Sequence, residues 1–198
     1  MTSIIRHRPQ VRVASKRKII AAFAAVTLVS IATGAEHSNG ASNDWRTGVI
    51  EQVERLHVVD DANALQIGQL AEVGFQETNS SRLLQERLRN AGFDIESGVA
   101  GMPTAFVATF GKEGPVVGFL AEFDALAGFS QTKDPVRTAI EGQSAGHACG
   151  HNLLGSGAVL AAVATKEWIT ANNVKGVIKV FGTPAEEGGG GKVYFARD

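Results

Sequence analysis

Residues able to hold a metal ion or move a proton gather at three places along the chain. They form three short groups: Glu122 and Asp124, then His147, Cys149 and His151, then Glu186 and Glu187. Zinc binds cysteine sulfur, histidine nitrogen and carboxylate oxygen, and its catalytic sites leave one position open for water. Binding lowers the pKa of that water from about 15.7 to about 7. The three groups therefore contain the donors of a hydrolytic metal centre.

The paired glutamates suit a division of labour. Glu186 and Glu187 are adjacent at the end of a predicted strand, where neighbouring side chains point to different sides. One carboxylate could therefore bind a metal ion while the other takes a proton from water as a general base. The four glycines at 188–191 allow the backbone to approach a metal ion or substrate without Cβ clashes.

Each group also has a simpler interpretation. Cys149 could be a small buried apolar side chain, Asp124 could cap a turn, and His147 could hydrogen-bond within a loop. Two histidines near glycines could cap a helix, and paired glutamates usually face solvent. The combination of all three groups favours the metal centre. Gly191-Lys192 does not belong to a Walker phosphate loop, which requires glycine at position 186 and serine or threonine at position 193.

The three groups lie at the boundaries of predicted elements. We expect strands over 104–110, 116–123 and 177–181, and helices from 44, from about 80, over 153–170 and after 191. Ligands in open α/β sheets bind beyond the carboxyl ends of the strands, so the three groups should converge there. Alternating helices and strands predict an α/β fold with a mainly parallel or mixed sheet flanked by helices.

Four finer expectations concern individual elements. The opening helix should pack through an apolar stripe: Val49, Val53, Leu56 and Val59. Ser80 or Ser81 should cap the second helix, and Gly92 should end it in a left-handed turn. The apolar run 116–123 suits a strand buried on both faces. Residues 125–146 show no periodicity and predict a long loop around an active site.

Composition excludes several classes of protein. The chain has 198 residues, of which 44% are apolar, and a formal net charge of −1. It is therefore long and apolar enough for a globular core, and it lacks the excess of basic residues expected of a nucleic-acid partner. Cys149 is the single cysteine, so no intramolecular disulfide can form. A thiol redox protein is disfavoured because the chain has no resolving cysteine.

The amino-terminal segment resembles an export signal. Basic residues between Arg6 and Lys18 precede an apolar run at 19–35 that ends in small residues. We interpret residues 1–35 as a signal peptide and residues 36–43 as a polar tether. The protein is then expected to be exported, to the periplasm or beyond. An uncleaved signal would instead anchor it in the membrane, because 17 apolar residues are just long enough to span a bilayer.

Three ordered motifs resemble those of the zinc amidohydrolases related to aminoacylase, carboxypeptidase and indole-acetyl-amino-acid hydrolases. They are the runs at 121–126 (AEFDAL), 146–152 (GHACGHN) and 182–192 (GTPAEEGGGGK). The similarity extends from about residue 44 to the end. The runs at 74–77 and 98–106, together with Asn152, resemble the branch that contains the second of the aminobenzoyl-glutamate utilisation proteins and dipeptidases for β-alanyl dipeptides.

The resemblance implies a role for each residue of the groups. Cys149, His151 and Glu187 would be metal ligands, Glu186 the general base, and Asp124 an orienting carboxylate behind the ligands. It further implies a two-metal centre that holds zinc, with manganese or cobalt as alternatives. A small-molecule amide substrate and a homodimer are implied as partners. Residues 44–198 would be the amino-terminal part of the catalytic domain, and the inserted dimerisation or lid domain would be absent from this chain.

The resemblance also predicts what the chain lacks. Relatives are about twice as long and carry further ligands, typically histidines, beyond the position of Asp198. The missing strands would leave an exposed sheet edge and apolar surface. The expected activity is hydrolysis of an amide bond in N-acyl amino acids, aminobenzoyl-glutamate-like conjugates or dipeptides. The alternative is a truncated, non-catalytic metal-binding or interaction remnant. Asn152 and Glu122 depart from the auxin-conjugate branch, which weakens any transfer of substrate specificity.

Overall fold

The computed structural model describes residues 44–198, all of which fall within one compact unit. The predicted signal peptide and tether lie outside these residues. The main helices are α1 (Asp44–Leu70), α2 (Thr78–Asn90), α3 (His151–Ala171) and α4 (Gly191–Arg197). The strands are β1 (Asp94–Ser97), β2 (Phe106–Phe110), β3 (Val116–Ala121), β4 (Leu126–Ala127), β5 (Ala145–Gly146) and β6 (Val177–Gly182). These bounds agree closely with the elements expected from the sequence.

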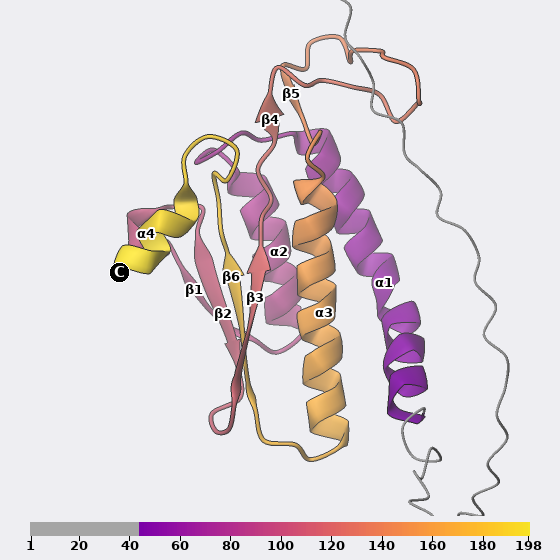
Figure 1. Ribbon diagram of the computed structural model, residues 1–198, viewed down its shortest axis with the longest axis vertical. Helices are drawn as coiled ribbons and strands as arrows, with labels where there is room; N and C mark the ends of the chain where they lie inside the picture. Colours follow the sequence, from indigo (N-terminus) through magenta and orange to yellow (C-terminus); the bar gives the residue numbers. More distant parts are fainter. Residues whose placement is uncertain (1–43) are drawn as a thin grey trace, which may run out of the picture. The chain divides into compact units, whose positions relative to one another are not determined.

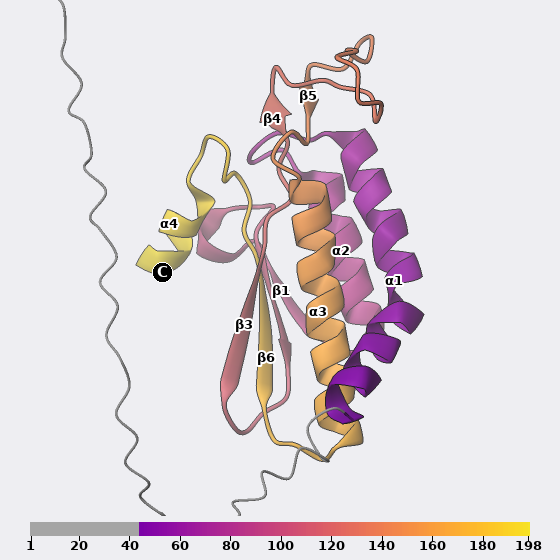
Figure 2. The ribbon, with the colours of Figure 1, turned by 45° about the vertical axis from the view of Figure 1, so that its right-hand side comes forward.

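The predicted fold class is confirmed. The larger sheet has the order β1-β2-β6-β3, in which β3 and β6 are parallel and the other two pairs are antiparallel. Helices α1, α2 and α3 lie on one side of this sheet, and α4 lies on the other (Figures 1 and 2). The core between sheet and helices includes Phe106, Phe123 and Val163, with the two phenylalanine rings stacked 6.2 Å apart. Burial of each such side chain contributes about 1.5–3 kcal/mol.

The buried stripe of α1 differs from the expected one. Val49, Val53 and Leu56 are partly buried, but Val59 faces solvent. The stripe continues through Asp60, which is buried and accepts hydrogen bonds from the Arg87 guanidinium at 3.0–3.2 Å. Helical spacing requires position 60 rather than 59 on this face. The sequence interpretation followed apolar character and missed a carboxylate that is buried because it is paired.

The expected cap of α2 is wrong. Ser80 and Ser81 lie inside the first turn and are buried. The Glu72 carboxylate satisfies the free N–H groups instead, accepting those of Asn79 at 3.1 Å and Ser80 at 2.8 Å. It also accepts hydrogen bonds from both side chains. The end of α2 is as predicted, since Gly92 adopts a φ of 86°.

The strand β3 is not buried on both faces as expected. Among the described strands it forms the edge of the larger sheet. Val116, Val117 and Leu120 are exposed, because β3 has a neighbour on one side alone. An exposed apolar edge of this kind was expected on the separate ground of family resemblance. Across residues 44–198, no helix is both long and apolar enough to cross a membrane.

We predict that Glu72 stabilises the start of α2 in a pH-dependent way. Burial raises the pKa of the Glu72 carboxyl, but hydrogen bonds from Ser80 and Asn79 outweigh it and hold the pKa below its ordinary value. Glu72→Ala should lower the free energy of unfolding at pH 7 by about 1–2 kcal/mol, the typical loss of a helix cap.

The sign of the pH effect follows from the lowered pKa. The stabilisation is present above the unfolded pKa of about 4.3 and is lost as the pH falls through the lower folded value. Urea unfolding at pH 7 and at successively lower pH values measures it. Glu86→Ala, which removes an exposed carboxylate from the same helix, is the control. A loss for Glu72→Ala equal to that of the control would contradict the capping role.

Candidate metal centre

Two parallel strands and one helix bring the three groups together. β3 and β6 are neighbours, and their last residues, Ala121 and Gly182, are paired. Glu122 and Asp124 therefore leave the sheet at the same end as the segment that carries Glu186 and Glu187. α3 begins at His151, directly after Gly150, which takes a left-handed conformation with a φ of 83°. The predicted convergence of all three groups at this end of the sheet is observed.

Cys149, His151 and Glu187 can reach a common ion. One ligand atom from each residue lies within 4.8 Å of the others. The His151 ring is buried, the Glu187 side chain is mostly buried, and Cys149 is exposed. Glu187 Oε1 is buried without a hydrogen-bond partner in the described chain. A buried carboxylate oxygen without a partner is costly, and sulfur, nitrogen and oxygen donors suit zinc. The three residues therefore fit a metal ion.

Asp124 connects two of these three residues. Its Oδ1 lies 3.0 Å from His151 Nδ1, and its Oδ2 accepts the Glu187 N–H at 2.9 Å. The Asp124 carbonyl oxygen is also 3.1 Å from His151 Nδ1. Because both neighbours of Nδ1 are acceptors, this nitrogen must carry the proton. His151 Nε2 is then left with a lone pair for a metal ion. This is the position expected of an orienting carboxylate.

Glu186 lies at the open side of the centre. Its Oε2 is 3.7 Å from His151 Nε2, and its side chain is 44% exposed. Glu187, the next residue, turns inward instead. The two adjacent glutamates therefore differ in exposure in the way that one general base and one ligand require, although their roles remain predictions.

Two further residues contact the centre. Glu122 Oε2 lies 3.1 Å from His151 Nε2, and Glu122 Oε1 pairs with Lys192 at the start of α4. Glu122 was visible in the sequence beside Asp124, but its contact with His151 was not predicted. Lys192 gave no local signal, because the fold alone brings together residues 70 positions apart. This pair places one positive charge beside several carboxylates.

His147 does not join the centre. Its Nδ1 accepts the Asn152 N–H at 3.2 Å, and its Nε2 lies 3.2 Å from the Ile67 carbonyl oxygen. The simpler interpretation of His147 as a loop residue is therefore the one the structure favours. Burial lowers the pKa of His147 below its usual value, which suits a neutral ring with one donor and one acceptor nitrogen.

The carboxylates around Cys149 disfavour its thiolate. The negative charge of Glu187, followed by desolvation and by the charges of Glu186 and Glu122, raises the pKa of the Cys149 thiol. A bound cation has the opposite effect and deprotonates a coordinating thiol. Reactive redox cysteines lie in electropositive surroundings, so this acidic environment further disfavours the thiol redox alternative.

A buried carboxylate fixes the turn that carries Glu186 and Glu187. Glu77 is fully buried, and it accepts the Ala185 N–H at 2.8 Å and the Thr104 hydroxyl at 2.9 Å. Ala185 has a φ of 57°, an unfavourable conformation for alanine. A Cβ on Gly74 would lie 2.9 Å from the Ala185 Cβ, so no side chain fits there. Glu77 belonged to a recognised sequence motif, but nothing local indicated this role.

Together, the mixed sheet and the three convergent donors define a metal-binding α/β protein. Residues 118–197 match the family model for peptidase family M20/M25/M40, and the chain belongs to this family. The predicted resemblance is confirmed.

Relatives agree with this assignment. The chain is 39% identical over 148 residues, 74% of its length, to a subunit of the p-aminobenzoyl-glutamate hydrolase of Escherichia coli, and 36% identical over 131 residues, 63% of its length, to thermostable carboxypeptidase 1 of Saccharolobus solfataricus. It spans 30% and 31% of those two proteins. A solved structure described as an aminohydrolase from methicillin-resistant Staphylococcus aureus shares the fold, with a TM-score of 0.62 at 23% identity over 76% of this chain and 38% of that one.

We predict that Asp124 controls metal affinity without touching the ion. Asp124→Asn should weaken zinc binding about tenfold to a hundredfold, because the amide cannot accept from both His151 Nδ1 and the Glu187 N–H with a full negative charge. Competition against a chromogenic chelator measures the affinity. Asp134→Asn, an exposed carboxylate of the 128–144 loop, should have no effect. Equal affinities for both variants would contradict the orienting role.

We also predict that Glu77 is needed for the turn. Glu77→Ala leaves the buried Ala185 N–H and Thr104 hydroxyl without partners and should lower the free energy of unfolding by at least about 2 kcal/mol. Glu77→Gln keeps an acceptor for Ala185 and should lose less. Urea unfolding measures both, with Gln76→Ala, an exposed neighbour, as control. A Glu77→Ala variant as stable as Gln76→Ala would refute this role.

Proposed function

We propose that the protein carrying this chain is a metal-dependent amidohydrolase. Its substrates would be N-acyl amino acids, aminobenzoyl-glutamate-like conjugates or dipeptides. The observation that carries the proposal is the convergence of Cys149, His151 and Glu187, with the free Glu186 carboxylate beside them. The names of the two relatives, a hydrolase of p-aminobenzoyl-glutamate and a carboxypeptidase, both denote cleavage of amide bonds.

Cys149, His151 and Glu187 would hold the metal ion. When bound, the ion supplies a Lewis acid for the substrate carbonyl and acidifies water. We propose zinc, because a thiolate, an imidazole and a carboxylate together suit it, with manganese or cobalt as alternatives. A two-metal centre would need ligands in addition to this group of three.

The chain's own residues would then move the proton and hold the geometry. Glu186 would accept the proton of the attacking water at a carboxylate oxygen and deliver it to the nitrogen of the leaving amine. Asp124 would keep the His151 ring and the Glu187 backbone in place throughout. The Lys192 ammonium would hold Glu122 and offset its charge. This sequence of proton transfers requires no covalent intermediate.

Location and assembly are further parts of the proposal. The basic and apolar character of residues 1–35 supports export to the periplasm or beyond, with membrane anchoring by an uncleaved signal as the alternative. A homodimer is proposed from family resemblance alone. The Escherichia coli relative is named as a subunit, which supports some form of assembly.

We predict that Glu186→Gln separates chemistry from metal binding. In the protein expressed from its complete reading frame and loaded with zinc, kcat for N-acyl amino acids should fall about 10²–10⁴-fold. Metal content and KM should stay close to those of the unchanged protein, because Glu186 is not one of the three donors. Glu141→Gln, an exposed loop carboxylate, is the control.

Two results would count against the proposed activity. The first is zinc-loaded protein that hydrolyses no N-acyl amino acid, aminobenzoyl-glutamate conjugate or dipeptide. This would favour the alternative of a non-catalytic metal-binding chain. The second is a Glu186→Gln variant that keeps full activity, which would remove the assigned general base.

A further inference from the structure

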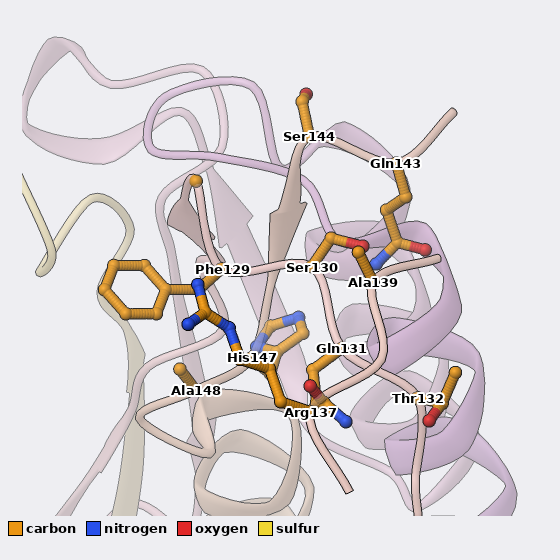
Figure 3. A pocket seen from close by; sticks show the side chains of 11 residues that line it. Phe129, Ser130, Gln131, Thr132, Arg137, Ala139, Gln143, Ser144, His147 and Ala148 are labelled. Atoms are coloured by element: carbon orange, nitrogen blue, oxygen red, sulfur yellow. The ribbon is translucent and has the colours of Figure 1, made fainter. Parts of the chain in front are cut away.

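The long loop between β4 and β5 encloses a pocket beside the metal centre. The pocket has a volume of about 980 Å³ and is lined by eleven residues, most of them from the segment 128–144 (Figure 3). His147 and Ala148 complete its wall. Cys149 is the next residue in the chain, and consecutive Cα atoms are about 3.8 Å apart. The pocket therefore adjoins the proposed ligand Cys149.

The base of this loop is firmly joined to the site. Leu126 and Ala127 pair with Gly146 and Ala145 in the β4–β5 ladder. Gly146 lies so close to the opposite limb that a Cβ would be 2.2 Å from the Phe129 carbonyl oxygen. The two limbs of the loop thus meet between Asp124 and Cys149. A ligand in the pocket would be held at a fixed position relative to both residues.

Arg137 gives the pocket a positive charge. No carboxylate belongs to the described pocket wall, and no ion-pair partner of Arg137 occurs among residues 44–198. Figure 3 shows its side chain reaching from the far limb of the loop toward the side where Phe129, His147 and Ala148 lie. An unpaired guanidinium in a concave site is ready to accept a carboxylate as a two-pronged donor.

The backbone around Arg137 is held on both sides. The Gln131 side chain donates to the Val136 carbonyl oxygen at 2.7 Å and accepts the Thr138 N–H at 3.0 Å. Val136 and Thr138 are the two neighbours of Arg137, so a single amide group fixes the segment that presents the guanidinium. A preorganised charge binds its ligand at a lower entropic cost than a mobile one.

We propose that this pocket binds a carboxylate of the substrate and that Arg137 is a specificity-determining residue. The inference rests on the proposed amidohydrolase function and adds the charge of the substrate to it. The carboxylate could be the α-carboxylate of the amino acid released by hydrolysis or an acidic side chain on it. Both bind a guanidinium by the same chemistry, and different ligands distinguish them.

The test compares ligands that differ in one charge. N-benzoylglycine carries an α-carboxylate, N-benzoylglycinamide lacks it, and N-benzoylglutamate α-amide carries a side-chain carboxylate alone. Calorimetric titration of the zinc-loaded Glu186→Gln protein measures binding without hydrolysis. We expect at least one carboxylate ligand to bind about tenfold to a hundredfold more tightly than N-benzoylglycinamide. Whichever carboxylate is preferred identifies the source.

Variants of the loop then assign the preference. Arg137→Gln should abolish the discrimination between charged and neutral ligands, and Arg137→Lys should restore part of it. Lys133→Gln removes a positive charge from the same loop outside the pocket wall and should leave the discrimination intact. Gln131→Ala should weaken it by releasing the segment that carries Arg137.

Kinetics separates failure of this inference from failure of the proposed function. Without the Glu186 substitution, Arg137→Gln should raise KM for the preferred carboxylate substrate about tenfold or more, with kcat little changed. An active protein whose preference survives Arg137→Gln would overturn the subsite and leave the amidohydrolase function standing. Equal binding of charged and neutral ligands by the Glu186→Gln protein, or binding of neither, would also overturn the subsite. Charge-dependent binding at Arg137 without any hydrolysis would support the subsite and count against the activity.

Discussion

The buried carboxylate of Asp124 holds the candidate centre together. It accepts from His151 Nδ1 with one oxygen and from the Glu187 N–H with the other, and so joins the start of α3 to the segment after β6. A buried carboxylate is stable when its oxygens are paired. The same contacts therefore satisfy Asp124 and direct His151 Nε2 and the Glu187 side chain toward a common ion.

This constraint works because the backbone around it is equally restricted. The parallel pairing of β3 with β6 sets Asp124 and the Glu186-Glu187 segment at one end of the sheet. Glu77 then holds the strained Ala185 from the side away from the metal donors. Strained conformations of this kind cost about 1–3 kcal/mol and persist where the surroundings impose them. Part of the folding energy is thus used to separate an exposed base from a buried donor.

Sequence patterns predicted the elements and their convergence, because local periodicity and turn residues determine both. They failed where a polar group takes the place of an apolar one through a distant partner. Asp60 is buried because Arg87 pairs with it, and Glu72 caps α2 in place of the nearby serines. The exposure of β3 depends on which strands lie beside it, which its own composition does not show. Lys192 likewise reaches Glu122 through tertiary structure alone.

The central claim is that Cys149, His151 and Glu187 bind one metal ion in the arrangement that Asp124 maintains. X-ray absorption spectroscopy of the zinc-loaded protein tests it most directly. The account predicts one sulfur at about 2.3 Å and nitrogen or oxygen ligands at about 2.0–2.2 Å, with the sulfur contribution lost in Cys149→Ala. A spectrum with nitrogen and oxygen ligands alone, unchanged by Cys149→Ala, would contradict it.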